Sequence, residues 1–119
     1  MLHDMKLYSE NYDRIELGNR LREYRLYDEK RRLIKIGDTI RFTRLPDKDK
    51  CCYADVVNIE VFKTWYDCYN KYFEEDFKSR YAKVQDVVDD TYSDGYYTQE
   101  ETDKYGCCCI TLSKVRKNK

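Results

Sequence analysis

Several common functional sites are excluded because the sequence has few of the residues that build them. The 119 residues include 4 glycines, 1 proline and 1 histidine. Phosphate loops, dinucleotide fingerprints and nucleophile elbows depend on glycine, and none of these motifs occurs. Tetrahedral zinc sites need cysteine and histidine at regular spacing, which one histidine and no C-x-x-C pair do not provide. We therefore expect no metal site and no cofactor.

The chain also has no excess of charge and no long apolar run. Its 23 Lys and Arg residues are balanced by 23 Asp and Glu residues, whereas proteins that coat nucleic acid broadly carry a large excess of cations. Any nucleic-acid site should therefore be a local patch. No apolar run approaches the roughly 20 residues that span a bilayer, and the first residues lack the apolar core of a secretory signal. We expect a cytoplasmic protein with no membrane partner.

Tyrosine is abundant, and it should supply much of the core. The 13 tyrosines bring the aromatic fraction to 15%, in a chain that is 39% charged. A buried ring removes much apolar area from water while its hydroxyl stays at a wet edge. The length suits one core and is too short for two, so residues 1–119 are expected to form a single domain.

The six cysteines are expected to be free thiols. They occur as Cys51-Cys52, Cys68 and the run 107–109. Neighbours on a strand point to opposite faces, so adjacent cysteines do not suit a disulfide framework. In a buried strand, cysteine acts as a small apolar residue. Reduced thiols also fit a cytoplasmic location.

Alternating apolar residues predict a set of short strands. These strands cover residues 2–7, 22–26, 34–36, 40–42, 52–62 and 107–112. His3 falls on the apolar side of the first strand, so we expect it to be packed rather than catalytic. Gly37-Asp38 predicts a tight turn between the third and fourth strands. A change of apolar phase at Val56-Val57 predicts a bulge of the kind found at barrel corners.

Helical spacing predicts helices that cover these strands. The first begins on the hydroxyl of Ser9 and ends at Gly18, and a capping box at Thr98 begins the last, which ends at Gly106. The clearest begins at Thr64. Its buried stripe consists of Trp65, Cys68, Tyr69, Tyr72 and Phe73. A shorter helix carries Tyr81, Val84, Val87 and Val88. The pattern predicts a mixed, mostly antiparallel β-barrel of about five or six strands with helices outside.

One stretch combines two cations with a carboxylate just after a glycine, at Gly18, Arg20, Glu23 and Arg25. The spacing resembles the G-x-K-x-x-E-x-R motif of the activating signal cointegrator homology (ASCH) family, within the PUA-like superfamily. Arg20 stands in place of the lysine in that motif. Residues 26–32, 34–40, 96–97 and 104–106 also resemble the family, so the resemblance covers nearly the whole chain. It implies an α+β PUA-like barrel with a cleft that binds RNA or nucleotides.

The motif supplies suitable chemistry for such a cleft. An arginine fork binds a phosphate or a base edge, and a carboxylate holds that fork or accepts from an amino group. Arg20, Glu23 and Arg25 are therefore candidate ligand contacts, with a solvated ion-pair cluster as the alternative. In an ideal strand Arg20 would point away from Glu23 and Arg25, so it can join them only from a corner at Gly18-Asn19.

Four further residues are candidate contacts. Tyr27 and Tyr97 resemble family positions near the cleft and can stack on a base, with core packing as the alternative for each. Lys30 and Arg31 can contact phosphates at the rim, or they can form an ordinary solvated turn.

The sequence thus predicts an RNA- or nucleotide-binding protein, and two alternatives stay open. One is a hydrolase, because some similar proteins are amidohydrolases that act on acetylated cytidine and others have been suspected of nuclease activity. In the amidohydrolase branch the motif lysine is the base and a threonine at the Glu23 position is the nucleophile. Arg20 stays protonated and Glu23 has no hydroxyl, which weakens this alternative. The other is a regulatory protein–protein interaction module. Ligand identity, catalysis and oligomeric state are not determined by the sequence.

Overall fold

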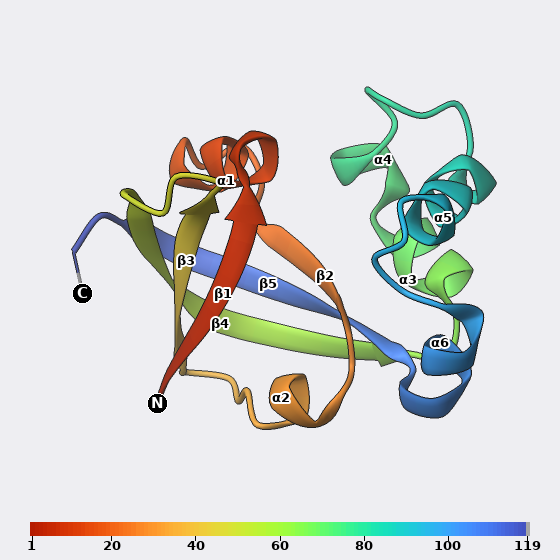
Figure 1. Ribbon diagram of the computed structural model, residues 1–119, viewed down its shortest axis with the longest axis horizontal. Helices are drawn as coiled ribbons and strands as arrows, with labels where there is room; N and C mark the ends of the chain where they lie inside the picture. The colour runs from red at the N-terminus through yellow and green to blue at the C-terminus, as the bar shows by residue number, and fades with distance from the viewer. Residues whose placement is uncertain (119) are drawn as a thin grey trace. The chain divides into compact units, whose positions relative to one another are not determined.

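The computed structural model describes residues 1–118, in which five strands form one mixed sheet (Figure 1). In hydrogen-bonding order they are β1 (Leu2–Tyr8), β3 (Thr39–Leu45), β4 (Cys51–Phe62), β5 (Cys107–Arg116) and β2 (Arg22–Leu26). β1 and β3 are parallel, whereas β3 and β4 are antiparallel. The predicted fold class, an α+β PUA-like fold with flanking helices, is confirmed, and the predicted mixed β-barrel is a five-stranded half-barrel.

The contacts of the chain cluster in two compact units. Unit 1 comprises residues 1–23, 34–59 and 110–118, and unit 2 comprises residues 24–33 and 60–109. The helices are α1 (Ser9–Glu16), α2 (Glu29–Arg32), α3 (Trp65–Lys71), α4 (Phe73–Asp76), α5 (Val84–Ser93) and α6 (Gln99–Tyr105). β2, β4 and β5 each contribute residues to both units. That the chain is a single domain stays a prediction.

The core of unit 1 follows the predicted alternation. The buried residues of β1 are His3, Met5 and Leu7. α1 packs against β1 and β3 and places Tyr12 and Ile15 fully inside. The predicted cap is wrong, because the N-cap position is Tyr8 and no side chain caps this end. His3 is packed as expected, with its Nε2 2.8 Å from a carboxylate oxygen of Asp38.

The strand predicted at residues 34–36 is wrong. The carboxylate of Asp38 accepts a hydrogen bond from the backbone N–H of Lys35 at 3.0 Å, which closes a turn, and Gly37 has a φ of +97°. Such local side-chain bonds compete with strand pairing. The turn buries Ile34 but leaves Ile36 65% exposed. β3 therefore begins only at Thr39.

The second apolar phase of β4 is largely exposed, and the bulge predicted at Val56-Val57 stays a prediction. Cys52, Ala54 and Val56 are buried as expected, but Val57 and Val61 are 45% and 52% exposed. The apolar alternation in the second half of β4 thus faces solvent, because burial depends on what covers a face and not on the alternation itself.

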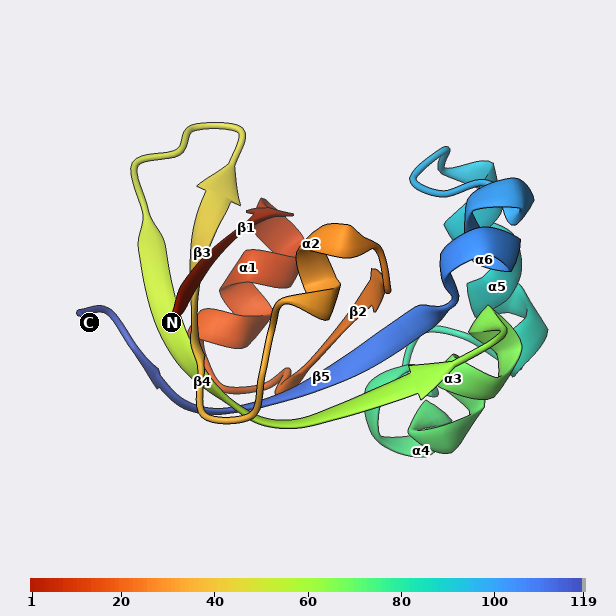
Figure 2. The same cartoon turned by 90° about the horizontal axis from the view of Figure 1, so that it is seen from below.

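Most of the helices belong to unit 2 (Figure 2). Its core is aromatic and cysteine-rich. α3 begins where the Thr64 hydroxyl accepts from the backbone N–H of Asp67, and it buries Trp65, Cys68 and Tyr69 as predicted. The helix breaks at Tyr72, so the last part of the predicted stripe lies in α4. α6 has the predicted capping box at Thr98. The buried residues of α5 are Val84, Val87 and Val88.

Candidate functional site

Arg20 and Glu23 form an ion pair within unit 1. Arg20 Nη2 donates to Glu23 Oε1 at 2.9 Å, and Arg20 Nε donates to the backbone oxygen of Arg22 at 3.0 Å. The side chains of Arg20 and Glu23 are 14% and 3% exposed. The chain itself fixes two of the three guanidinium nitrogens, so the plane of the fork is set without a ligand. The pair is thus not a solvated surface ion pair.

Arg20 reaches its partner because the chain turns sharply between α1 and β2. Gly18 has a φ of +78°, which favours glycine. The backbone N–H groups of Asn19 and Arg20 both donate to the oxygen of Arg14, at 2.9 and 3.1 Å. Because β2 begins only at Arg22, strand alternation does not dictate the direction of Arg20. A corner therefore lies where the sequence predicted one.

Arg25 lies in the part of β2 that belongs to unit 2. Its strand neighbours Tyr24 and Leu26 are in the core, so strand alternation places Arg25 on the opposite face. Its side chain is half-buried. Burial raises the pKa of Cys108 to about 12, an effect that the charge of Arg31 and the backbone N–H of Arg25 partly oppose. Arg31 and the backbone of Arg25 therefore both lie near the neutral thiol of Cys108.

Arg31 is held by Asp28 rather than solvated. Asp28 caps α2: its Oδ1 accepts from the backbone N–H of Arg31 at 3.1 Å, and its Oδ2 accepts from Arg31 Nη1 at 3.0 Å. The Arg31 side chain is only 15% exposed. A solvated turn was one of the two expectations here, and the cap was not anticipated, although an aspartate followed by an acidic residue is a helix-start signal.

Tyr27 carries a structural contact on one face of its ring. The guanidinium of Arg32 lies 4.5 Å from the ring centre, and Arg32 also donates to the backbone oxygens of Tyr27 and Tyr105, at 2.9 and 3.2 Å. The backbone N–H of Tyr27 donates to the oxygen of Gly106 at 3.0 Å. Arg32 therefore joins α2 to the end of α6 and fixes the position of Tyr27.

Tyr97 ends a stack of three aromatic rings. The ring centre of Tyr97 is 5.3 Å from that of Trp65, and the ring centre of Trp65 is 5.3 Å from that of Tyr69. The angle between the ring planes is 21° in each pair, so the rings are stacked. Trp65 and Tyr69 are buried, whereas Tyr97 is half-buried. Tyr97 thus belongs to the core packing of unit 2 and still reaches the surface, so both roles weighed for it from the sequence are compatible with its position.

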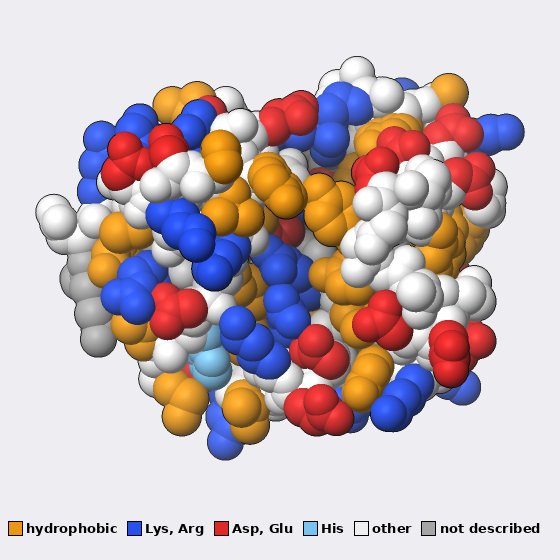
Figure 3. Space-filling view, viewed as in Figure 1, with side chains coloured by type: hydrophobic (Ala, Val, Ile, Leu, Met, Phe, Trp, Pro, Cys, Tyr) orange, Lys and Arg blue, Asp and Glu red, His pale blue; other side chains and the backbone are white. Residues whose placement is uncertain are grey.

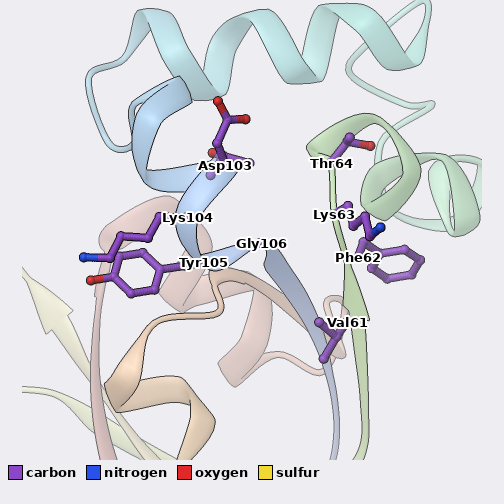
Figure 4. Close-up of a pocket in the computed structure, with 9 residues that line it drawn as sticks. Val61, Phe62, Lys63, Thr64, Asp103, Lys104, Tyr105 and Gly106 are labelled. Carbon is purple, nitrogen blue, oxygen red and sulfur yellow. The ribbon is translucent and has the colours of Figure 1, made fainter.

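A groove of about 740 Å³ within unit 2 lacks convergent polar groups. It is lined by residues 61–64 and 102–106 (Figure 4). The side chains of Lys104 and Tyr105 point away from the gap on one side, and those of Phe62 and Lys63 point away on the other. A Cβ on Gly106 would lie 2.8 Å from the backbone oxygen of Phe62. Ligand pockets need placed polar groups, so we assign no ligand to this groove, and none of the predicted contacts lines it.

Charge is divided unequally between the units. The described residues of unit 1 contain 12 Lys and Arg against 9 Asp and Glu, a net charge of +3. Unit 2 contains 10 against 14, a net charge of −4. Figure 3 shows acidic side chains over the helices and several Lys and Arg side chains over the strands. The near-zero total therefore conceals a more basic and a more acidic part.

Two features of other site classes are not found in residues 1–118. No cluster of three or more His, Cys, Asp or Glu side chains is arranged to hold a metal ion. No helix in this range is both long and apolar enough to cross a membrane. All six cysteines are free thiols, and only Cys51 is exposed.

Similar solved structures share this fold over nearly the whole chain. The crystal structure of the hypothetical protein PH0355 is 30% identical, with a TM-score of 0.78 over 95% of this chain and 98% of that one. The solution structure of protein PF0455 from Pyrococcus furiosus is 29% identical, with a TM-score of 0.72 over 95% and 96%. The S128A mutant of ZmASCH from Zymomonas mobilis is 13% identical, with a TM-score of 0.62 over 95% and 68%. The chain matches no protein-family model and no curated protein.

Proposed function

Because this chain is an ASCH-like domain and belongs to the same family as PH0355, we propose that it binds RNA or a nucleotide-like ligand through Arg20, Glu23 and Arg25. A PUA-like fold is a common setting for RNA binding, and the fold makes this function class the first choice. A shared fold does not specify a ligand by itself. The side chains must therefore carry the proposal.

The observation that carries it is the fixed fork of Arg20. A surface ion pair would leave both partners solvated and mobile. Instead, Glu23 is buried and Arg20 is fixed at Nε and Nη2, while the hydrogen bonds described for this side chain leave Nη1 unused. A preorganised fork loses little entropy when it binds a phosphate or a base edge. Arg25 follows on the same strand and provides a second fork in the proposal.

The remaining predicted contacts have supporting roles in this proposal. Tyr97 extends an aromatic stack to the surface, where a base can continue it. Tyr27 has one face covered by Arg32, which leaves stacking on a base to its other face. Lys30 is exposed and can contact phosphate only as a flexible point charge, whereas Arg31 is anchored.

The amidohydrolase alternative gains no support from this geometry. It needs a base at the Arg20 position, and a guanidinium stays protonated in proteins. The ion pair with Glu23 favours that charged form further. Glu23 is committed to Arg20 and has no hydroxyl with which to act as the nucleophile of that branch.

Binding of a short fluorescent single-stranded RNA, followed by anisotropy, tests the proposal. Replacing Arg25 by Ala should weaken binding about ten- to a hundredfold, since a charged hydrogen bond contributes roughly 1.5–3 kcal/mol. Arg25→Lys should restore part of this, because lysine keeps the charge but loses the fork. Lys83→Ala, at an exposed cation of unit 2, removes the same charge and should bind as the parent does.

Two results would count against the proposal. Equal RNA affinity in the parent and in Arg25→Ala would remove Arg25 as a contact. Absence of binding by the parent to short RNAs and to nucleotides would remove the function itself.

A further inference from the structure

α2 and the turn before it concentrate positive charge in an acidic unit. Residues 24–33 contain four cations and two carboxylates, a net charge of +2. The rest of unit 2, residues 60–109, contains 6 Lys and Arg against 12 Asp and Glu, a net charge of −6. A phosphate is repelled by most of this unit and attracted only locally. Residues 24–33 are therefore the place in unit 2 where an anionic group can be bound.

Only one of the three cations on α2 is both anchored and available. Arg32 already donates to two backbone oxygens and covers the ring of Tyr27. Lys30 is exposed, and no hydrogen bond given for residues 1–118 orients its side chain. Arg31 is 15% exposed and is oriented by Asp28 through Nη1.

The fork of Arg31 is incompletely used. Its Nε is buried and has no hydrogen-bond partner in the described part of the chain. Asp28 takes Nη1 and the backbone N–H, and none of the hydrogen bonds described for Arg31 uses Nη2. A planar guanidinium binds a phosphate most strongly through two parallel donors. With Nη1 directed by Asp28, the orientation of the guanidinium is set, and Nη2 retains donor capacity.

The neighbours of Arg31 leave part of its charge uncompensated. The nearby thiol of Cys108 stays neutral near pH 7, because burial raises its pKa to about 12. The carboxylate of Asp28 is shared between the Arg31 side chain and the N-terminus of α2, and it is 25% exposed to water. Water screens this pair more than it screens the buried Glu23.

We propose that Arg31 binds a phosphate group of the ligand and that Asp28 positions it. This inference rests on the proposed function and deepens it, because it assigns the ligand to the phosphate-bearing class, a nucleotide or RNA rather than a free nucleoside. Of the two phosphate contacts predicted on α2, Lys30 and Arg31, this makes Arg31 the principal one. Asp28 acts through Arg31, so it is a positioning residue and touches no ligand itself.

The first arm of the test uses the short single-stranded RNA. Arg31→Ala should lower its affinity about tenfold and reduce the slope of log affinity against log salt by about one, as expected for one lost phosphate contact. Lys78→Ala, at an exposed cation paired with Glu74, is the matched control and should change neither quantity. Asp28→Asn keeps an oxygen that can cap α2 but loses the charge that orients Arg31, so affinity should fall about threefold without unfolding.

The second arm uses inorganic phosphate and nitrogen-15 NMR. Buried N–H groups exchange slowly, so the Arg31 Nε–Hε signal should be visible, and its absence from Arg31→Lys assigns it. Phosphate should shift this signal saturably in the parent and with lower affinity in Asp28→Asn. Adenosine 5′-monophosphate should shift it too, whereas adenosine should not. A purely structural Asp28 would leave the phosphate affinity of Arg31 unchanged.

The two arms separate this inference from the proposed function. RNA binding with full affinity in Arg31→Ala, together with no phosphate shift, overturns the role of Arg31 and leaves the proposed function intact. A phosphate shift at Arg31 in a protein that binds no RNA or nucleotide retains the phosphate site and overturns the proposed function. A shift caused equally by adenosine overturns the assignment to phosphate.

Discussion

Units 1 and 2 each contain an arginine paired with a carboxylate three residues away, but they bury different members of the pair. In unit 1 the carboxylate of Glu23 is 3% exposed beside Arg20 at 14%. In unit 2 Asp28 is 25% exposed beside Arg31 at 15%. A buried carboxylate depends on its cation, whereas one in contact with water does not. The same spacing therefore gives one pair whose loss should destabilise the fold strongly and one whose loss should cost little stability.

The two cores differ as well. The core of unit 1 consists mainly of aliphatic residues on strands with alternating burial, among them Met5, Leu7, Ile40 and Leu112. Unit 2 is closed by helices that pack Trp65 and several tyrosine and cysteine residues together. Aromatic side chains carry polar atoms inward, which must find partners. Unit 2 should therefore be more sensitive to the loss of single buried hydrogen bonds.

The largest expected effect on stability concerns the pair of Arg20 and Glu23. Arg20→Ala should lower the free energy of unfolding by about 3–5 kcal/mol, because the buried carboxylate of Glu23 loses its ion pair with Arg20. Arg31→Ala should cost no more than about 1 kcal/mol, because Asp28 stays solvated. Urea unfolding followed by tryptophan fluorescence measures both. In the double variant Arg20→Met with Glu23→Leu, much of the stability should return, and equal losses in the two single variants would contradict the comparison.

The next effect concerns a buried hydroxyl in unit 2. Thr102 Oγ1 accepts from Trp65 Nε1 at 2.9 Å and from the Tyr92 hydroxyl at 3.2 Å. Thr102→Val has nearly the same shape but leaves these donors unsatisfied, so unfolding should become easier by about 2–3 kcal/mol. Thr43→Val makes the same change at a half-buried site of β3 in unit 1, where about 0.5 kcal/mol or less is expected. Similar losses at both sites would show that the cores do not differ in this way.

A smaller effect depends on pH and lies in unit 1. Hydrogen bonds from His3 and from the backbone of Lys35 lower the pKa of Asp38 to about 2. Since the ordinary value is 3.8, the carboxylate stabilises the fold fully above that pH. The contribution, about 2 kcal/mol, is lost as the pH falls towards 2.

Urea unfolding between pH 5 and pH 2 tests this contribution. Asp38→Asn should be less stable than the parent at pH 5, and the difference should shrink as the pH falls. A difference that stays constant over this range would exclude Asp38 as the titrating group.

The smallest expected effect concerns the reactivity of exposed and buried thiols. Cys51 is exposed, whereas the other five cysteines are buried. Burial raises the pKa of Cys52 to about 11 and that of Cys108 to about 12, so these thiols should be unreactive at pH 8. A thiol reagent should find one fast group in the native protein and six in denaturant, and Cys51→Ser should remove the fast phase. Three or more fast groups in the native protein would show that unit 2 opens readily, because Cys51 and Cys52 are the two cysteines of unit 1.

Local signals in the sequence were sufficient for much of the fold. The stripe from Trp65 and the capping box at Thr98 depend on neighbours within two helical turns, and the structure contains both. The errors occurred where burial depends on distant parts of the chain. Ile36 and Val57 alternate like core residues but remain exposed because nothing covers that side. Periodicity describes which residues share a face and not what packs on it.

The candidate site shows the same division. The corner at Gly18 and the pairing of Arg20 with Glu23 follow from short-range geometry and were anticipated. The anchoring of Arg31 and Arg32 by other parts of the chain was not, because a run of basic residues gives no sign of which one turns inward. That choice depends on Asp28 and on the end of α6, which lies more than 70 residues away at Tyr105.

The proposed function requires Arg20 to contact RNA or a nucleotide, and an NMR titration tests this most directly. Arg20 Nε–Hε is hydrogen-bonded to a backbone oxygen and that of Arg31 is buried, so both signals should be observable. On addition of the short single-stranded RNA, the Arg20 signal should shift saturably, and the Arg31 signal reports separately on the phosphate contact. RNA that binds but leaves the Arg20 signal unshifted would contradict the account.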